Sequence, residues 1–239
     1  MLHIYNTPDE VSKALAEWIT QTIETTLQKQ DRFTWVVTGG NSPKQLYELL
    51  AASPYRERID WGKLHIFWGD ERAVPFEDSR NNAKMTFEHL LSKVPVVRDQ
   101  VHIMDTTLSP EESANAYEAI LHRYFAPEGP SFDLVLNGMG DDGHTLSLFP
   151  HTPVIHEQKA WVKSFYLDAQ QMYRITLTAP IVNRAYKVAF LTFGANKSNA
   201  LFEVLKGTPN IDLYPSQIIQ PASGELHWFV DSLAAGQLK

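Results

Sequence analysis

Blocks of mainly apolar residues alternate along the chain with blocks in which apolar residues recur every three or four positions. The first kind is typical of buried strands and occupies residues 2–5, 33–38, 64–68, 132–136, 161–165, 175–177, 188–193 and 228–230. The second kind is typical of helices that pack on one face and occupies residues 8–27, 42–50, 81–91, 109–125 and 197–205, with a terminal helix from 231. This alternation predicts an α/β fold with a doubly wound, mostly parallel sheet that carries helices on both faces.

Two helix starts are marked by capping residues. Thr7 precedes Pro8, and Glu10 stands three positions after Thr7; the same spacing recurs from Ser109 to Glu112. A side-chain oxygen at the cap accepts an N–H of the first turn, and the glutamate returns a bond to the cap. Proline suits the first helical position because its missing N–H would have no partner there. Both spacings therefore predict where a helix begins.

The composition is that of an ordinary globular chain, with 44% hydrophobic and 21% charged residues. It shows no repeat, low-complexity tract or linker, so we predict a single domain over residues 1–239. Cysteine is absent, which excludes disulfides, thiolate nucleophiles and cysteine-based zinc sites. No apolar stretch approaches the ~20 residues of a membrane span, and the N-terminus lacks a signal-peptide pattern. We therefore expect no membrane partner and a cytoplasmic location.

The formal net charge of −7 narrows the choice of partner. An acidic surface argues against nucleic acid and against anionic membranes. An anionic small molecule remains possible if cations and backbone N–H groups gather locally around it. Oligomeric state is left open by the sequence.

In a parallel sheet, ligands bind beyond the carboxyl ends of the strands, so we expect the loops after the predicted strands to carry the chemistry. The first such loop contains Gly39, Gly40, Asn41 and Ser42. Glycines allow a close backbone approach, and the following helix start offers free N–H groups. We interpret the loop as a cradle for a phosphate or a sugar. The alternative is a tight turn in which Ser42 only caps the helix.

The second loop carries three charged residues, Asp70, Glu71 and Arg72, directly after an apolar strand. Arg72 is a candidate to bind a phosphate or to stabilise an oxyanion. Asp70 is a candidate to hold an arginine, a sugar hydroxyl or a catalytic water. The alternative is a solvated run of charges at the end of a strand.

The third loop, residues 138–149, combines three glycines with two carboxylates and His144. A histidine titrates near neutral pH and suits the role of a general base. Asp142, two positions earlier, is a candidate to fix its tautomer or to position a water. Ser147 lacks the G-x-S-x-G surroundings of a serine-hydrolase nucleophile. The alternative is a structural histidine in a glycine-rich turn.

Two downstream cations complete the candidate site. Lys197 follows the predicted strand 188–193, as the strand-end rule requires, whereas Arg174 stands at the start of its apolar run. Surface ion pairs are the alternative for both residues. His144, His151 and His156 do not have the spacing of a metal-binding motif, so we expect neither a metal nor a cofactor.

Together these motifs resemble those of the glucosamine-6-phosphate isomerase/6-phosphogluconolactonase family, and the resemblance to its lactonases covers essentially the whole chain. Residues 138–150, GMGDDGHTLSLFP, are similar to the family pattern G-x-G-x-D-G-H-T-A-S-L-F-P, with Leu146 in place of alanine. Residues 39–43, GGNSP, are similar to G-G-S-T-P, and residues 70–75 and 174–176 also match. Residues 78–82 depart from the usual D-S-N-Y, which leaves the fine substrate contacts open.

The resemblance implies hydrolysis of a sugar-phosphate lactone, 6-phospho-D-glucono-1,5-lactone, in the oxidative pentose phosphate pathway. It also implies a fold related to glucosamine-6-phosphate deaminase and ribose-5-phosphate isomerase. In the resulting hypothesis, His144 takes a proton from water, and Asp142 orients either His144 or the water. Arg72, together with loop N–H groups, stabilises the oxyanion. Candidates for holding the phosphate are Arg174, Lys197 and the loop of residues 39–42.

Two other functions remain to be weighed. Amino-sugar-phosphate deaminases and isomerases of this family resemble the third loop but read G-H-I-A-F-N-E-P, with a glutamate five positions after the histidine. Phe149 stands at that position here, which argues against ring-opening isomerisation. A non-catalytic sugar-phosphate sensor would keep the glycine loop and the cations, yet it would not need His144 or Asp142.

Overall fold

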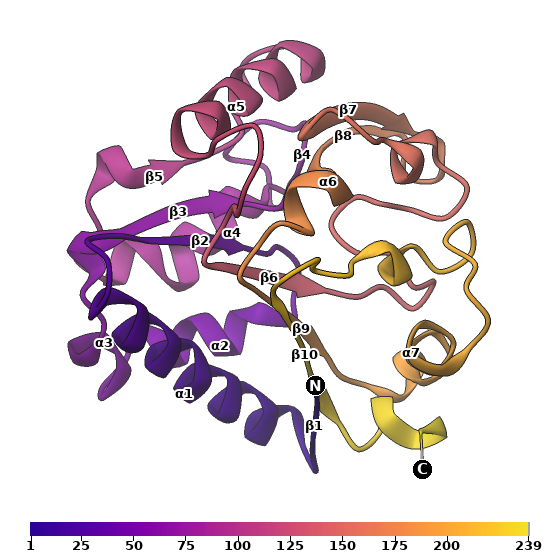
Figure 1. Ribbon diagram of the computed structural model, residues 1–239, viewed down its shortest axis with the longest axis horizontal. Helices are drawn as coiled ribbons and strands as arrows, with labels where there is room; N and C mark the ends of the chain where they lie inside the picture. Colours follow the sequence, from indigo (N-terminus) through magenta and orange to yellow (C-terminus); the bar gives the residue numbers. More distant parts are fainter. Residues whose placement is uncertain (239) are drawn as a thin grey trace.

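A parallel sheet of seven strands runs through the middle of the computed structural model, which describes residues 1–238 (Figure 1). The strand order is β1-β10-β9-β6-β2-β3-β5. These strands are β1 (Leu2–Tyr5), β2 (Phe33–Val37), β3 (Leu64–Trp68), β5 (Val101–His102), β6 (Leu134–Gly138), β9 (Lys187–Thr192) and β10 (Glu225–Asp231). From β2 the chain winds outward through β3 to β5, and from β6 it winds the other way through β9 to β10. The predicted doubly wound sheet is confirmed, and its winding reverses between β2 and β6.

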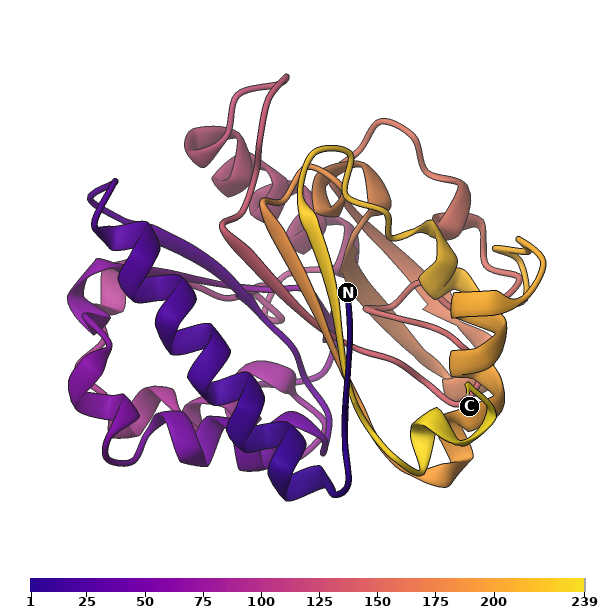
Figure 2. The same ribbon diagram turned by 60° about the horizontal axis from the view of Figure 1, so that its bottom comes forward.

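Helices cover both faces of this sheet, with α1 on one side and α7 on the other (Figure 2). The helices are α1 (Pro8–Leu27), α2 (Pro43–Leu50), α3 (Tyr55–Arg58), α4 (Asn82–His89), α5 (Pro110–Tyr124), α6 (Ala179–Val182) and α7 (Ser198–Lys206). Side chains of β2 alternate between two cores, because successive strand residues point to opposite faces. Trp35 and Val37 pack with α1, α2 and α4, whereas Val36 packs with α5, α6 and α7. No helix among residues 1–238 is long and apolar enough to cross a membrane.

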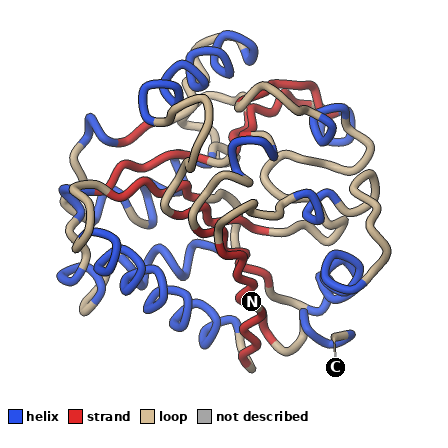
Figure 3. The backbone as a smooth tube through the Cα atoms, in the orientation of Figure 1, coloured by secondary structure: helices blue, strands red, loops and turns tan. Residues whose placement is uncertain are grey.

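A second, antiparallel sheet in the order β4-β8-β7 packs against α5, and Figure 3 shows its strands as a separate group. Its strands are β4 (Asp70–Arg72), β7 (Val162–Leu167) and β8 (Met172–Leu177). The apolar runs at 161–165 and 175–177 are strands as predicted, but they pair with each other and with β4 instead of joining the parallel sheet. The short connection between them explains this, because parallel strands need a much longer crossover.

Gly69 turns the chain from the parallel sheet into the antiparallel one. Its N–H donates to the carbonyl of Val37 at 3.2 Å, and its carbonyl accepts from the N–H of Leu177 at 2.8 Å. A Cβ at this position would lie 2.5 Å from Cδ2 of Leu146, so a side chain does not fit. The turn places the polar residues of β4 at the carboxyl end of the parallel sheet.

The predicted helix starts hold with one difference in hydrogen bonding. Ser109 and Glu112 form a complete capping box. Thr7 accepts from the N–H of Glu10 as predicted, but the Glu10 carboxylate accepts from the N–H of Asn6 and not from the cap itself.

Several element boundaries differ from the prediction by up to three residues, among them the start of α4 and that of the terminal helix. α4 begins at Asn82 because the side chain of Asn81 caps it by accepting the N–H of Lys84 at 2.9 Å. The terminal helix was predicted from 231, yet β10 extends to Asp231 and only a short 3-10 helix, Ala234–Gln237, follows.

Candidate active site

A pocket of about 180 Å³ opens at the carboxyl ends of the strands, where the winding reverses. The loops after β2, β3, β6 and β9 all reach it, as the strand-end rule requires. Of the predicted site residues, it is lined by Gly39, Gly40, Asn41, Ser42, Asp70, Arg72, His144, Arg174 and Lys197. A wider groove of about 650 Å³ lies against α1 at the amino ends of the strands, and none of these residues lines it.

The loop after β2 presents backbone and hydroxyl groups to the pocket. Gly40 has a φ of 91°, which favours glycine, and a Cβ on Gly39 would lie 1.9 Å from Oδ1 of Asn82. Ser42 precedes α2 but makes no side-chain capping bond, so its interpretation as a helix cap is wrong. The Ser42 hydroxyl is therefore available to an anion. The first two helical residues add no free N–H, because Pro43 has none and that of Lys44 donates to the carbonyl of Asn41 at 3.3 Å.

His144 and Asp142 form a close pair on the loop after β6. Nδ1 of His144 lies 2.6 Å from Oδ1 of Asp142, and the same oxygen accepts the backbone N–H of His144 at 3.0 Å. Because a carboxylate only accepts, this contact assigns the proton to Nδ1 and leaves a lone pair on Nε2. Burial alone would raise the pKa of Asp142, but the hydrogen bonds and charge of His144 outweigh it and lower the pKa.

Glycines make the turn that brings this pair together. The N–H of Gly140 donates to the carbonyl of His144 at 2.8 Å, which closes the loop. A Cβ on Gly140 would lie 2.1 Å from Nδ1 of His144 and 2.3 Å from Oδ1 of Asp142. Gly143 has a φ of 78°, in the left-handed region. Gly140 and Gly143 of the predicted motif are thus needed to let the carboxylate and the imidazole meet.

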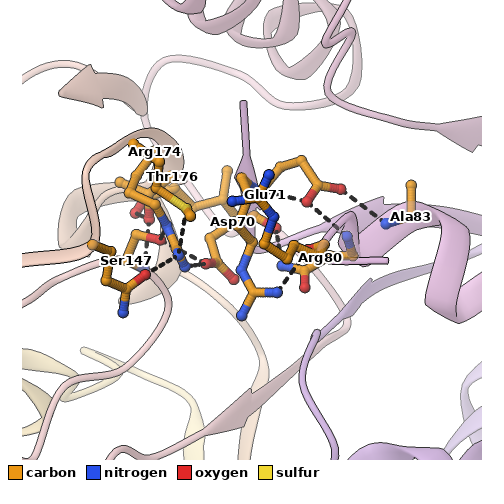
Figure 4. Close-up of polar contacts among 12 residues, drawn as sticks. Asp70, Glu71, Arg80, Ala83, Ser147, Arg174 and Thr176 are labelled. Carbon is orange, nitrogen blue, oxygen red and sulfur yellow. Dashed lines mark hydrogen bonds and ion pairs between the residues drawn. The ribbon is translucent and has the colours of Figure 1, made fainter. Parts of the chain in front are cut away.

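Asp70 and Arg174 form a second pair, which is buried (Figure 4). Nη2 of Arg174 lies 2.9 Å from Oδ2 of Asp70, and the hydroxyl of Ser147 donates to that oxygen at 2.6 Å. Nε of Arg174 donates to the same hydroxyl at 2.9 Å, and Nη1 donates to Oε1 of Gln170 at 3.0 Å. Burial lowers the pKa of Arg174, against the opposing charge of Asp70. All three guanidinium nitrogens therefore already have protein partners.

β8 begins at Met172, three residues before the predicted strand 175–177, so Arg174 lies within the strand. In the antiparallel pairing of β4 with β8, Arg174 stands directly opposite Arg72. This cross-strand contact could not be inferred from the strand-end rule, which applies to the parallel sheet.

Arg72 and Lys197 are the pocket cations that form no ion pair within residues 1–238. Nη1 of Arg72 donates to the carbonyl of Arg80 at 2.7 Å, and its Nε is buried without a hydrogen-bond partner. Lys197 ends a short 3-10 helix, Ala195–Lys197, directly after β9. The pocket thus carries positive charge that no carboxylate in this part of the structure neutralises.

Glu71 and Asn82 belong to the site although the sequence did not single out their contacts. The buried Glu71 carboxylate accepts the backbone N–H groups of Asn82 at 2.7 Å and Ala83 at 2.8 Å, which anchors α4 beside β4. Burial raises the pKa of Glu71 to about 7, and the backbone hydrogen bonds oppose this shift. Nδ2 of Asn82 donates to the carbonyl of Asp70 at 3.0 Å. The only signal of this role in the sequence was the position of Glu71 between two other charged residues, directly after an apolar strand.

Phe149 was noted in the sequence only as a replacement for glutamate. In the structure its ring stacks on the imidazole of His144, with centroids 4.0 Å apart and planes inclined by 24°.

Among residues 1–238, no three histidine, aspartate or glutamate side chains are arranged to hold a metal ion.

The sequence matches those of known proteins over most of its length. The family model described as glucosamine-6-phosphate isomerases/6-phosphogluconolactonase matches residues 6–228. The chain belongs to this family. A relative from Synechocystis sp., named 6-phosphogluconolactonase, is 39% identical over 225 residues, which cover 92% of this chain and 91% of the relative.

Solved structures agree with the family assignment. The 6-phosphogluconolactonase from Trypanosoma brucei aligns with a TM-score of 0.88 and 28% identity, covering 100% of this chain and 98% of that one. A monomeric glucosamine-6-phosphate deaminase aligns with a TM-score of 0.84 and 17% identity, covering 98% of each chain. The second likeness shows the fold alone and confirms the predicted relation to the deaminase fold.

Proposed function

We propose that the chain hydrolyses 6-phospho-D-glucono-1,5-lactone to 6-phospho-D-gluconate in the oxidative pentose phosphate pathway. The observation that carries the proposal is the pair of Asp142 and His144, 2.6 Å apart, with Nε2 of His144 free at a pocket that contains unpaired cations. The names of the relatives point to the same reaction.

In the proposed mechanism His144 acts as a general base. Nε2 takes a proton from a water molecule as the water oxygen attacks the lactone carbonyl carbon. Asp142 holds the opposite nitrogen and stabilises the imidazolium that forms. When the tetrahedral intermediate collapses, the bond to the ring oxygen breaks and His144 returns the proton to that oxygen. The product is the open hydroxy acid, and no covalent enzyme intermediate is needed.

Electrostatic stabilisation is assigned to Arg72, because its guanidinium lines the pocket without a carboxylate partner. A general base contributes roughly 10²–10⁴-fold, and one oxyanion donor roughly 10²–10³-fold. A lactone is a reactive ester, so these two contributions suffice and the mechanism uses neither a metal nor a cofactor.

The phosphate is assigned to Lys197 and to the loop of residues 39–42. Lys197 supplies a charge and the loop supplies N–H and hydroxyl donors, the combination that binds phosphate at helix starts. Arg174 remains a candidate through Nη1, whose contacts are Gln170 and Met172. Its other two nitrogens are engaged by Ser147 and Asp70.

A serine mechanism is not supported by the contacts of Ser147. This residue is fully buried, its hydroxyl donates to Asp70, and it accepts from Arg174. A nucleophilic serine needs a base within hydrogen-bond reach, and here the proton is directed to a carboxylate that an arginine already neutralises.

The test is a pH-stat assay on freshly prepared lactone. We expect acid release well above the spontaneous rate, and no ammonia release from glucosamine 6-phosphate under the same conditions. Acid release at the spontaneous rate would refute the proposal, and ammonia release would instead assign a deaminase.

A further inference from the structure

The ring of Phe149 lies against two functional side chains. It stacks on the imidazole of His144 at a centroid distance of 4.0 Å, and Cζ of Arg174 lies 5.4 Å from the centre of the same ring. Phe149 is only 7% exposed. A hydrophobic ring therefore contacts both the proposed base and a buried cation of the same pocket.

The course of the loop brings Phe149 to this place. Leu146 has a φ of 54°, which reverses the chain, and the N–H of Leu148 donates to the carbonyl of Thr145 at 2.9 Å. A β-branched or bulky residue at positive φ carries strain, and packing must hold it there. The reversal returns residue 149 to the imidazole five positions earlier.

Asp142 alone does not fix the imidazole plane. A hydrogen bond at Nδ1 sets the position of one ring atom, while the terminal torsion of a histidine is broad. Contact with an aromatic face restricts the remaining rotation, because stacked rings favour a narrow range of inclination. With both contacts in place, the direction of the Nε2 lone pair is set.

The ring also shapes the electrostatics of His144. The face of an aromatic ring attracts a cation, so it favours the imidazolium that forms during catalysis.

We propose that Phe149 is a positioning residue for His144, holding the imidazole plane while Asp142 holds Nδ1. The proposal rests on the proposed function, in which His144 is the general base. Phe149 touches neither water nor lactone in this role and acts only through His144.

The decisive comparison is between Phe149→Leu and Phe149→Tyr. The leucine variant keeps an apolar side chain but removes the ring, and the tyrosine variant keeps the ring. For Phe149→Leu we expect kcat to fall roughly 10- to 100-fold, the range that a misplaced catalytic group costs. KM should change little, because Phe149 does not line the pocket. Phe149→Tyr should restore kcat towards the wild type.

Phe125→Leu is the matched control, because Phe125 is as buried as Phe149, at 8% exposure, and lies at the end of α5, outside the pocket lining. Phe149→Met provides a second non-aromatic variant should the leucine variant fail to fold. Wild-type kcat in the folded non-aromatic variant would overturn the proposal, as would an equal loss in Phe125→Leu.

The Nδ1–H proton of His144, which is hydrogen-bonded to Asp142, gives an NMR readout that does not depend on turnover. We expect a sharp, downfield resonance of this proton in the wild type and in Phe149→Tyr, and a broadened or lost resonance in Phe149→Leu, where the imidazole plane is no longer held. If the wild type hydrolyses no lactone, the proposed function fails, while this resonance still tests the positioning of His144. Identical resonances in all three proteins would overturn the inference.

Discussion

Two acid–base pairs meet at the same pocket in opposite states. Asp142 and His144 keep 43% and 27% of their side-chain surfaces exposed, whereas Asp70 and Arg174 keep 7% and 3%. The first pair leaves one imidazole nitrogen free. The second pair is buried, and every nitrogen of its guanidinium has a partner. A general base needs a nitrogen lone pair that no other group occupies. The pair of Asp142 and His144 is therefore suited to catalysis, and the pair of Asp70 and Arg174 to holding the pocket in place.

The difference predicts how each pair responds to mutation. Breaking a buried ion pair leaves an uncompensated charge in a low-dielectric interior, which costs stability. Removing the partly exposed His144 leaves no buried charge, so the fold should tolerate the change, whereas the proposed reaction should not. Activity and stability should therefore separate between the two regions.

The largest effect is expected for His144→Ala. Loss of the general base should lower kcat for lactone hydrolysis by roughly 10²–10⁴-fold, with the unfolding transition nearly unchanged. Stopped assays on fresh lactone and urea unfolding measure the two quantities.

His156→Ala is the control for that variant, because His156 also pairs with an aspartate, Asp212, at 2.9 Å. It lies outside the pocket and is 56% exposed. Near-normal turnover in His144→Ala would remove His144 from the mechanism. Loss of turnover in His156→Ala would show that such losses are not specific to the pocket.

The next effect is expected for Asp70→Ala, on stability. Arg174 would be left buried without its carboxylate, at a cost of roughly 3–5 kcal/mol in the free energy of unfolding. Lys13→Ala breaks the exposed pair with Asp9 and should change the unfolding free energy little. Equal urea midpoints for the wild type and Asp70→Ala would contradict the supporting role of this network.

The contrast between the two pairs also marks how far the sequence could predict the site. The loops after β2, β3, β6 and β9 converge because parallel strands end at one edge, and hydrophobic periodicity is enough to locate those ends. Asp142 and His144 lie two positions apart, so their contact is local. For these residues the sequence carries the information directly.

Arg174 and Phe149 could not be placed in the same way. The contact of Arg174 with Asp70 joins residues 104 positions apart and depends on a second sheet that the apolar runs did not reveal. The stacking of Phe149 on His144 depends on the positive φ of Leu146, which no residue pattern indicates. Contacts made by tertiary pairing or by unusual backbone geometry need coordinates.

Glu71 lies beside the buried pair and should make stability depend on pH. Its folded pKa of about 7 exceeds its ordinary value of 4.5, so the folded state holds the proton more tightly than the unfolded state. Stability should therefore be higher at low pH and fall as the pH rises from about 4.5 to 7, by about 3 kcal/mol from this group. Urea unfolding of the wild type and of Glu71→Gln across this pH range measures the contribution of Glu71 to the free energy of unfolding. A difference between the two proteins that is constant with pH would contradict the shift.

The smallest effect is expected for Lys197→Ala. This variant tests whether a pocket cation without an ion pair binds the substrate, in contrast to the paired Arg174. Lys197 has no carboxylate partner among the described residues, so its charge is free for a phosphate, and its loss should raise KM about tenfold with kcat little changed. Lys206→Ala removes the same charge from the exposed end of α7 and should leave KM unaltered. An unchanged KM in Lys197→Ala would mean that Lys197 does not bind the phosphate, and this role would then be assigned to Arg174. In that case Gln170 must leave Nη1 when substrate binds, and the buried network would take part in recognition as well as support.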